Sequence, residues 1–143
     1  MPNWCNNSVE ISHGDPAKIA LLAEAFKRGE FCQHVIPTPK ELTETVAGFM
    51  GGDQREAHEA QQKANREKYG YTDWYGFQTA NWGTKWDVGG DDGSIDVAED
   101  GRSFTASFDS AWSPPMGIYQ ALTEQGFHVR AYYYEPGMAY AGV

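Results

Sequence analysis

Residues 94–109 read SIDVAEDGRSFTASFD, and this pattern predicts a β-hairpin. Apolar residues alternate with polar ones at Ile95 and Val97, and again between Phe104 and Phe108. Such alternation is typical of strands with one buried face, because successive side chains of a strand point to opposite sides. Between the two runs, Asp100-Gly101 is a strong signal for a tight turn. The two strands are therefore expected to share one apolar face.

Further strands and helices flank this hairpin on both sides. After it, residues 113–125 have the apolar spacing of a helix, and residues 127–134 alternate as a long strand. Before it, residues 5–12 alternate as a strand, and residues 15–28 have the cap and apolar stripe of a helix. We also expect an edge strand within residues 138–143.

Residues 30–93 do not continue this regular pattern, and we expect them to form a long insertion after the first helix. The insertion is predicted to begin with a short extended piece at residues 31–36 and one or two helical turns at residues 40–49. A projecting helix with a weak apolar face is expected at residues 54–69, followed by an aromatic segment at residues 71–87 that packs back on the core.

The order of the elements predicts the fold class. Without the insertion, the order β, α, β, β, α, β is the split βαβ, or ferredoxin-like, arrangement. Right-handed crossovers then place both helices on one face of an antiparallel sheet. We therefore expect one α+β domain over residues 1–143, in which residues 30–93 elaborate a ferredoxin-like sheet.

The charge of the chain argues against direct binding to nucleic acid or to an anionic membrane. The 143 residues include 11 Lys and Arg against 20 Asp and Glu, a net charge of −9. An acidic surface repels phosphate groups but can bind a basic protein surface. RNA-recognition modules also need aromatic residues on the open sheet face, where we expect Ser8, Glu10, Thr105, Ser107 and Asp109.

The cysteines and histidines carry no recognisable cofactor or metal motif. Cys5 and Cys32 are the only cysteines and have no metal-type spacing, so we interpret them as free thiols in a reducing compartment. The four histidines are scattered, without ligand spacing and without a nucleophile motif around them. We found no signal sequence and no apolar run that would span a membrane, and we expect a cytoplasmic protein.

The first candidate site lies in the tract Trp82-Gly83-Thr84-Lys85-Trp86-Asp87. Trp82 and Trp86 are four residues apart, so on a helical turn they would share a side. With Lys85 and Asp87 they could wall a pocket for a small polar or anionic ligand. The alternative is a structural lid, in which both rings are buried over the sheet. We favour the lid, since aromatic clusters are more often core than site.

A second group of candidates comes from the end of the chain. Trp112 is expected to anchor the corner between a strand and a helix that Ser113 caps. Tyr132 and Tyr134 are expected on the sheet face opposite to the core, where they contact the lid or present an aromatic surface to a partner protein. Glu135 follows as a candidate acid or base if the pocket exists.

The chain also resembles a known family. The tracts that carry the resemblance run in order along the sequence: Met1-Pro2-Asn3-Trp4-Cys5-Asn6, Trp82-Gly83-Thr84-Lys85-Trp86-Asp87, Trp112-Ser113-Pro114-Pro115 and Tyr133-Tyr134-Glu135-Pro136-Gly137-Met138. They resemble phage and plasmid proteins with a YubB-type ferredoxin-like domain. The resemblance implies a mobile-element protein that acts inside a bacterial host cell. It implies no catalytic residues.

Two functional hypotheses follow. The first is a non-enzymatic acidic protein that engages a host protein and interferes with host defence or nucleic-acid handling, its acidic face imitating phosphate. The second is a small-molecule-binding protein or enzyme with a pocket between the Trp82/Trp86 lid and the sheet. We favour the first, because no catalytic constellation is present and the charge is strongly acidic.

Overall fold

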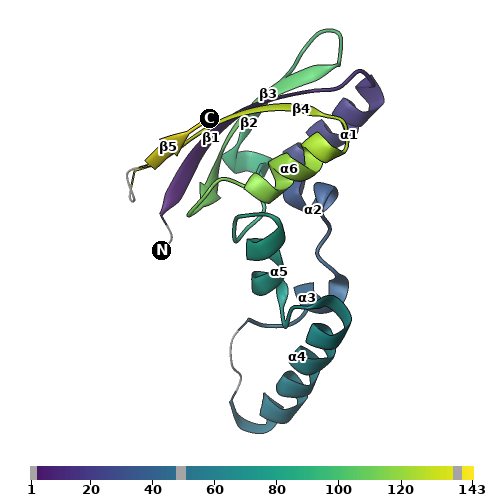
Figure 1. The fold of residues 1–143 in the computed structure, drawn as a ribbon, viewed down its shortest axis with the longest axis vertical. Helices are drawn as coiled ribbons and strands as arrows, with labels where there is room; N and C mark the ends of the chain where they lie inside the picture. The colour runs from purple at the N-terminus through teal and green to yellow at the C-terminus, as the bar shows by residue number, and fades with distance from the viewer. Residues whose placement is uncertain (1–2, 48–50, 137–139) are drawn as a thin grey trace.

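One antiparallel sheet organises the computed structural model, which describes residues 3–47, 51–136 and 140–143 (Figure 1). Within these residues the sheet has five strands in the order β2-β3-β1-β4-β5. Their bounds are β1 (Trp4–Ser12), β2 (Ser94–Val97), β3 (Ser103–Ala111), β4 (His128–Glu135) and β5 (Tyr140–Gly142). The predicted strands and the predicted hairpin are confirmed, and the architecture is α+β. Of the predicted edge strand, Met138 and Ala139 lie outside the described residues.

The register of the sheet brings the alternating apolar residues of neighbouring strands opposite one another. On β1, Val9 lies opposite Ala106 of β3 and Ala131 of β4. Ile11 lies opposite Phe104 and Val129 in the same way. Because the side-chain period of a strand is two, one register brings the apolar residues of all these strands to the same face.

Two helices, α1 (Pro16–Lys27) and α6 (Met116–Glu124), cover this apolar face (Figure 1). Asp15 caps α1, because its carboxylate accepts a hydrogen bond from the Ala17 backbone N–H at 3.0 Å. Leu22 and Phe26 of α1, together with Leu122 of α6, belong to the same buried cluster as the strand residues. Among the described residues, no α-helix labelled in Figure 1 covers the opposite face of the sheet, which the short 3₁₀ helix η2 (Gly90–Asp92) borders.

The described residues between 30 and 93 form mostly short helices, of which α5, α3 and α4 extend away from the side of the sheet that carries α6 (Figure 1). They are α2 (Phe31–Val35), α3 (Lys40–Thr43), η1 (Gly52–Gln54), α4 (Arg55–Tyr69), α5 (Trp74–Asn81) and η2 (Gly90–Asp92). The prediction of an extended piece at residues 31–36 is wrong, since α2 occupies that place. The predicted helical turns at residues 40–49 correspond to α3, and Phe49 lies outside the described residues.

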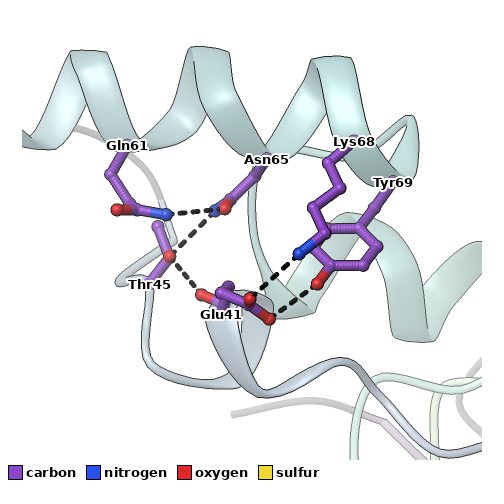
Figure 2. Close-up of polar contacts among 6 residues, drawn as sticks. All are labelled: Glu41, Thr45, Gln61, Asn65, Lys68 and Tyr69. Carbon is purple, nitrogen blue, oxygen red and sulfur yellow. Dashed lines mark hydrogen bonds and ion pairs between the residues drawn. The ribbon is translucent and has the colours of Figure 1, made fainter.

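Helix α4 projects away from the sheet, as its weak apolar face predicted (Figure 1). Only His58 and Asn65 of this helix are buried. Asn65 attaches the helix to two other segments: its side-chain amide donates to the Thr45 hydroxyl at 2.9 Å and to the Thr72 carbonyl at 2.8 Å. The amide oxygen of Asn65 accepts from Gln61 Nε2 at 2.7 Å (Figure 2).

A second polar contact joins α3 to the C-terminal end of α4. The Glu41 carboxylate of α3 accepts a hydrogen bond from the Tyr69 hydroxyl at 2.7 Å and lies 3.3 Å from Lys68 Nζ (Figure 2). Chiefly because of the Tyr69 hydrogen bond, the pKa of Glu41 falls from 4.5 to about 2. Polar contacts therefore attach α4 where an apolar face is lacking.

Candidate functional site

The open face of the sheet is an ordered grid of polar and aromatic side chains. Every second residue of each strand points away from α1 and α6. Asn6 of β1 lies between Asp109 of β3 and Tyr134 of β4. In the next row Ser8 lies between Ser107 and Tyr132. The centre of the face therefore has small polar side chains, with tyrosines on the β4 side and a serine and an aspartate on the β3 side.

A hollow of about 660 Å³ lies over this grid. Tyr132 and Tyr134 border it from β4, and both side chains are about half exposed. Asp91 and Asp92 border it from η2, and Asp109 borders it from β3. No Lys or Arg is among the described residues that line it. We call this feature the acidic trough.

The three carboxylates of the acidic trough have no partner among the described residues. Within the part of the chain that the structure describes, neither a hydrogen bond nor an ion pair engages the side chain of Asp91, Asp92 or Asp109. The negative charge is also unevenly placed along the chain. Residues 40–69 carry five Lys or Arg and six Asp or Glu, whereas the rest of the chain carries six and fourteen. The excess negative charge therefore belongs to the part of the chain that contains the sheet.

A second hollow, of about 450 Å³, continues the acidic trough at the start of β1. It shares Asp92 and Asp109 with the trough. Trp4 and Trp86 line it, with ring centroids 5.9 Å apart and ring planes inclined by 37°. The two rings are 45% and 39% exposed. We call this feature the tryptophan hollow.

Lys85 lies among aromatic rings beside the tryptophan hollow. Its Nζ is 4.6 Å from the ring centroid of Trp86, 5.4 Å from that of Trp112 and 5.7 Å from that of Tyr75. Ammonium groups at these distances gain cation–π stabilisation. Among the described residues Lys85 makes no ion pair.

Trp112 has an unusual backbone conformation for a bulky residue. Its φ is +68°, in the left-handed region that favours glycine, while its side chain is 42% exposed. The expectation that burial of Trp112 anchors the corner is therefore wrong. Ser113 does not cap α6 either, because its hydroxyl donates to the Gly83 carbonyl and Pro115 holds the cap position.

Asp87 has a structural role that the sequence did not reveal. Its carboxylate accepts hydrogen bonds from three backbone N–H groups: Cys32 at 2.6 Å, Gln33 at 2.9 Å and Val88 at 2.8 Å. Burial raises the pKa of Asp87, and these three hydrogen bonds oppose the rise by stabilising the charged form. The first turn of α2 is thus stabilised by a side chain more than fifty positions away.

Two other candidates are not at the surface. Trp82 is 1% exposed, belongs to the core cluster, and donates its indole N–H to the Ile36 carbonyl at 2.8 Å. Glu135 is fully buried. Trp82 and Trp86 do not share a helical side, because α5 ends at Asn81. The structure therefore has no lid formed by Trp82 and Trp86 together.

The sequence reasoning missed Trp4, Asp92 and Asp109 as site residues. A signal for Trp4 was present, since it has the same parity in β1 as Asn6 and Ser8 and so belongs to the open face. Asp92 lies two residues before β2, and the register of the β2-β3 hairpin, with Ser94 opposite Ser107, leads it toward Asp109; no such local relation brings Trp86 to Trp4. In the described part of the chain, no three His, Cys, Asp or Glu residues are grouped to hold a metal ion. No helix there has the length and apolar character to cross a membrane.

A solved structure shares this fold. No family model matches the sequence, and no curated protein matches it. The chain is similar to the crystal structure of protein api92 from Yersinia pseudotuberculosis, of the family model DUF1281, with a TM-score of 0.56 and 11% sequence identity. The similarity covers 99% of this chain and 93% of that chain. At this identity it shows a common α+β fold and no more.

Proposed function

We propose that this chain is a non-enzymatic binding protein that engages a basic surface of a partner protein through the acidic trough. The observation that carries the proposal is the arrangement of Asp91, Asp92 and Asp109 opposite Tyr132 and Tyr134. The carboxylates are exposed and have no partner among the described residues, and the two tyrosines are about half exposed. Carboxylates attract Lys and Arg side chains, and tyrosine rings stack with them.

The chemistry of the trough selects against nucleic acid and in favour of protein. A phosphate backbone would meet three carboxylates with no neighbouring Lys or Arg in the trough lining. A basic protein segment would instead gain an ion pair at each carboxylate, worth about 0.2–1 kcal/mol at an exposed site. Several such pairs, with stacking on the tyrosines, are needed for useful affinity.

The class of partner comes from the resemblance to YubB-type phage and plasmid proteins. On that basis we propose a ferredoxin-like domain that works in the cytoplasm of a bacterial host. Its partner would be a host protein of defence or nucleic-acid handling, whose basic surface takes the acidic trough in place of phosphate. The β2-β3-β1-β4 order of antiparallel strands supports the ferredoxin-like assignment.

A binding experiment with defined peptides tests the proposal. The probe is a Gly/Ser peptide with spaced lysines, and the comparison is the same peptide with glutamates. We expect the lysine peptide alone to bind, with an affinity that falls as salt is added. The triple variant Asp91→Asn, Asp92→Asn, Asp109→Asn should weaken binding about tenfold, since three exposed pairs sum to about 1.4 kcal/mol.

A matched control separates the trough from net charge. The triple variant Glu56→Gln, Glu67→Gln, Glu124→Gln changes the net charge equally at exposed helix positions outside the trough. It should bind the lysine peptide nearly as the unmodified chain does. Equal losses of affinity in both triple variants would show that only the net charge of the chain attracts the peptide, and would contradict the proposed site.

A second candidate function is small-molecule binding in the tryptophan hollow. Its volume of about 450 Å³ is within the range of ligand sites, and two tryptophans line it. Catalysis is not supported, because the Asp87 carboxylate is engaged by three backbone N–H groups. Adenosine, a neutral planar probe, should shift the indole NMR signals of Trp4 and Trp86 if this candidate is correct. Unchanged signals at high adenosine concentration count against it.

A further inference from the structure

We infer that the tryptophan hollow is an arginine pocket, which takes one guanidinium group of the basic partner segment. This inference deepens the proposed function and rests on it. It assigns a ligand to a site formed by Trp4, Trp86, Asp92 and Asp109, which come from β1, β3, η2 and the loop before η2.

The aromatic walls suit a planar cation. The Trp4 and Trp86 rings are neighbours at 5.9 Å, and each residue is more than a third exposed to solvent. Indole rings are the best cation–π partners among the side chains. A guanidinium is flat and weakly hydrated, so it stacks on such rings more readily than a compact ammonium does. Lys85 Nζ already lies 4.6 Å from the Trp86 centroid, so Trp4, which is 45% exposed, is the more open of the two walls.

The carboxylates that line the tryptophan hollow suit a guanidinium group with several N–H donors. Of the three aspartates that line the hollow, Asp87 is occupied by the backbone N–H groups of Cys32, Gln33 and Val88. Asp92 and Asp109 remain without a partner among the described residues. A guanidinium has five N–H donors and can engage carboxylates in bidentate fashion, whereas an ammonium acts as a point charge.

The position of the hollow explains why a peptide segment would reach it. The tryptophan hollow and the acidic trough share Asp92, Phe108 and Asp109, so they form one continuous surface. A segment that lies along the trough toward the start of β1 can place one side chain at the Trp4 and Trp86 rings. Long-range attraction by the trough and local selection by the hollow are thus separable.

The test uses two peptides and the full chain. One is the Gly/Ser peptide with spaced lysines, and the other has every lysine replaced by arginine. By calorimetric titration we expect the arginine peptide to bind about fivefold more tightly, as one added cation–π contact of about 1 kcal/mol implies. In Trp86→Leu and in Trp4→Leu this preference should disappear, while the affinity for the lysine peptide stays nearly unchanged.

Tyr75→Leu is the matched control, because Tyr75 is an exposed ring near Lys85 that lines neither hollow. It should retain the fivefold preference. Equal affinities for the two peptides would overturn the arginine pocket and leave the proposed function standing. A preference that survives both tryptophan variants would also overturn the assignment of this site. Failure of both peptides to bind would overturn the pocket and the proposed function together.

Discussion

Replacing Trp82 with alanine should be among the most destabilising single changes in this chain. Trp82 is 1% exposed and lies in the core cluster with Phe108 and Ile118. Truncating a buried tryptophan costs about 3–5 kcal/mol, because apolar burial is lost and a cavity remains. The Ile36 carbonyl also loses the indole N–H that now lies 2.8 Å away, which adds about 1 kcal/mol.

The expected loss is a large fraction of the total, since a domain of this kind has about 5–15 kcal/mol of stability. Urea unfolding followed by far-UV circular dichroism measures it without relying on tryptophan fluorescence. The melting temperature should fall by roughly 10 °C or more. Trp86→Ala is the control: the side chain is 39% exposed, so we expect a loss of about 1–2 kcal/mol and no buried cavity.

Similar losses in the two alanine variants would refute the argument that Trp82 is core and Trp86 is surface. Trp82→Phe isolates the hydrogen bond, because it retains much of the buried volume and removes only the indole N–H. It should fall between the unmodified chain and Trp82→Ala. A Trp82→Phe variant as unstable as Trp82→Ala would show that the contact with Ile36, rather than packing, dominates.

Three further predictions concern other positions. Trp112→Gly should be at least as stable as Trp112→Ala in urea unfolding, because a left-handed φ of +68° costs an L-residue about 1–2 kcal/mol and glycine adopts it freely; a clear advantage of alanine would contradict this. Asn65→Ala should increase amide hydrogen exchange throughout α4 and leave β1 protected, since the helix is held by Asn65 more than by apolar packing; unchanged exchange in α4 would show another anchor. Because the pKa of Glu41 is lowered from 4.5 to about 2, its stabilising contact is present above pH 4.5 and is lost as the pH falls toward 2. The Tyr69 ring signals should therefore shift near pH 2, and Glu41→Gln should abolish that step; a step near pH 4.5 in the unmodified chain would argue against the contact.

The elements that were predictable are those whose signal is local. Helix α1 carries its own cap in Asp15 and its own apolar stripe. The hairpin of β2 and β3 carries its alternation and its Asp100-Gly101 turn. Helix α2 was not predictable in this way, because it begins without a side-chain cap of its own and its first N–H groups are bound by the distant Asp87.

The residues of the candidate site also differ in whether local sequence could predict their position. Tyr132 and Tyr134 were placed correctly on the face opposite to the core, since a single strand fixes their parity. Trp82 and Trp86 were wrongly expected on one side, because residues after Asn81 do not continue the helix and no period relates them. The nearness of Asp92 to Asp109 follows from the hairpin register, which sets Ser94 opposite Ser107, whereas the contact between Trp4 and Trp86 has no such local signal.

What the chain encodes locally is the sequence of strands and helices, the parity of each strand and the excess of negative charge. Hydrophobic periodicity suffices for these, because each depends on residues within a few positions of one another. The burial of Trp82, the cap on α2 and the meeting of Trp4, Trp86, Asp92 and Asp109 depend instead on the folded chain. Those contacts join segments far apart in sequence, and packing of the whole domain, rather than any local preference, sets their distances.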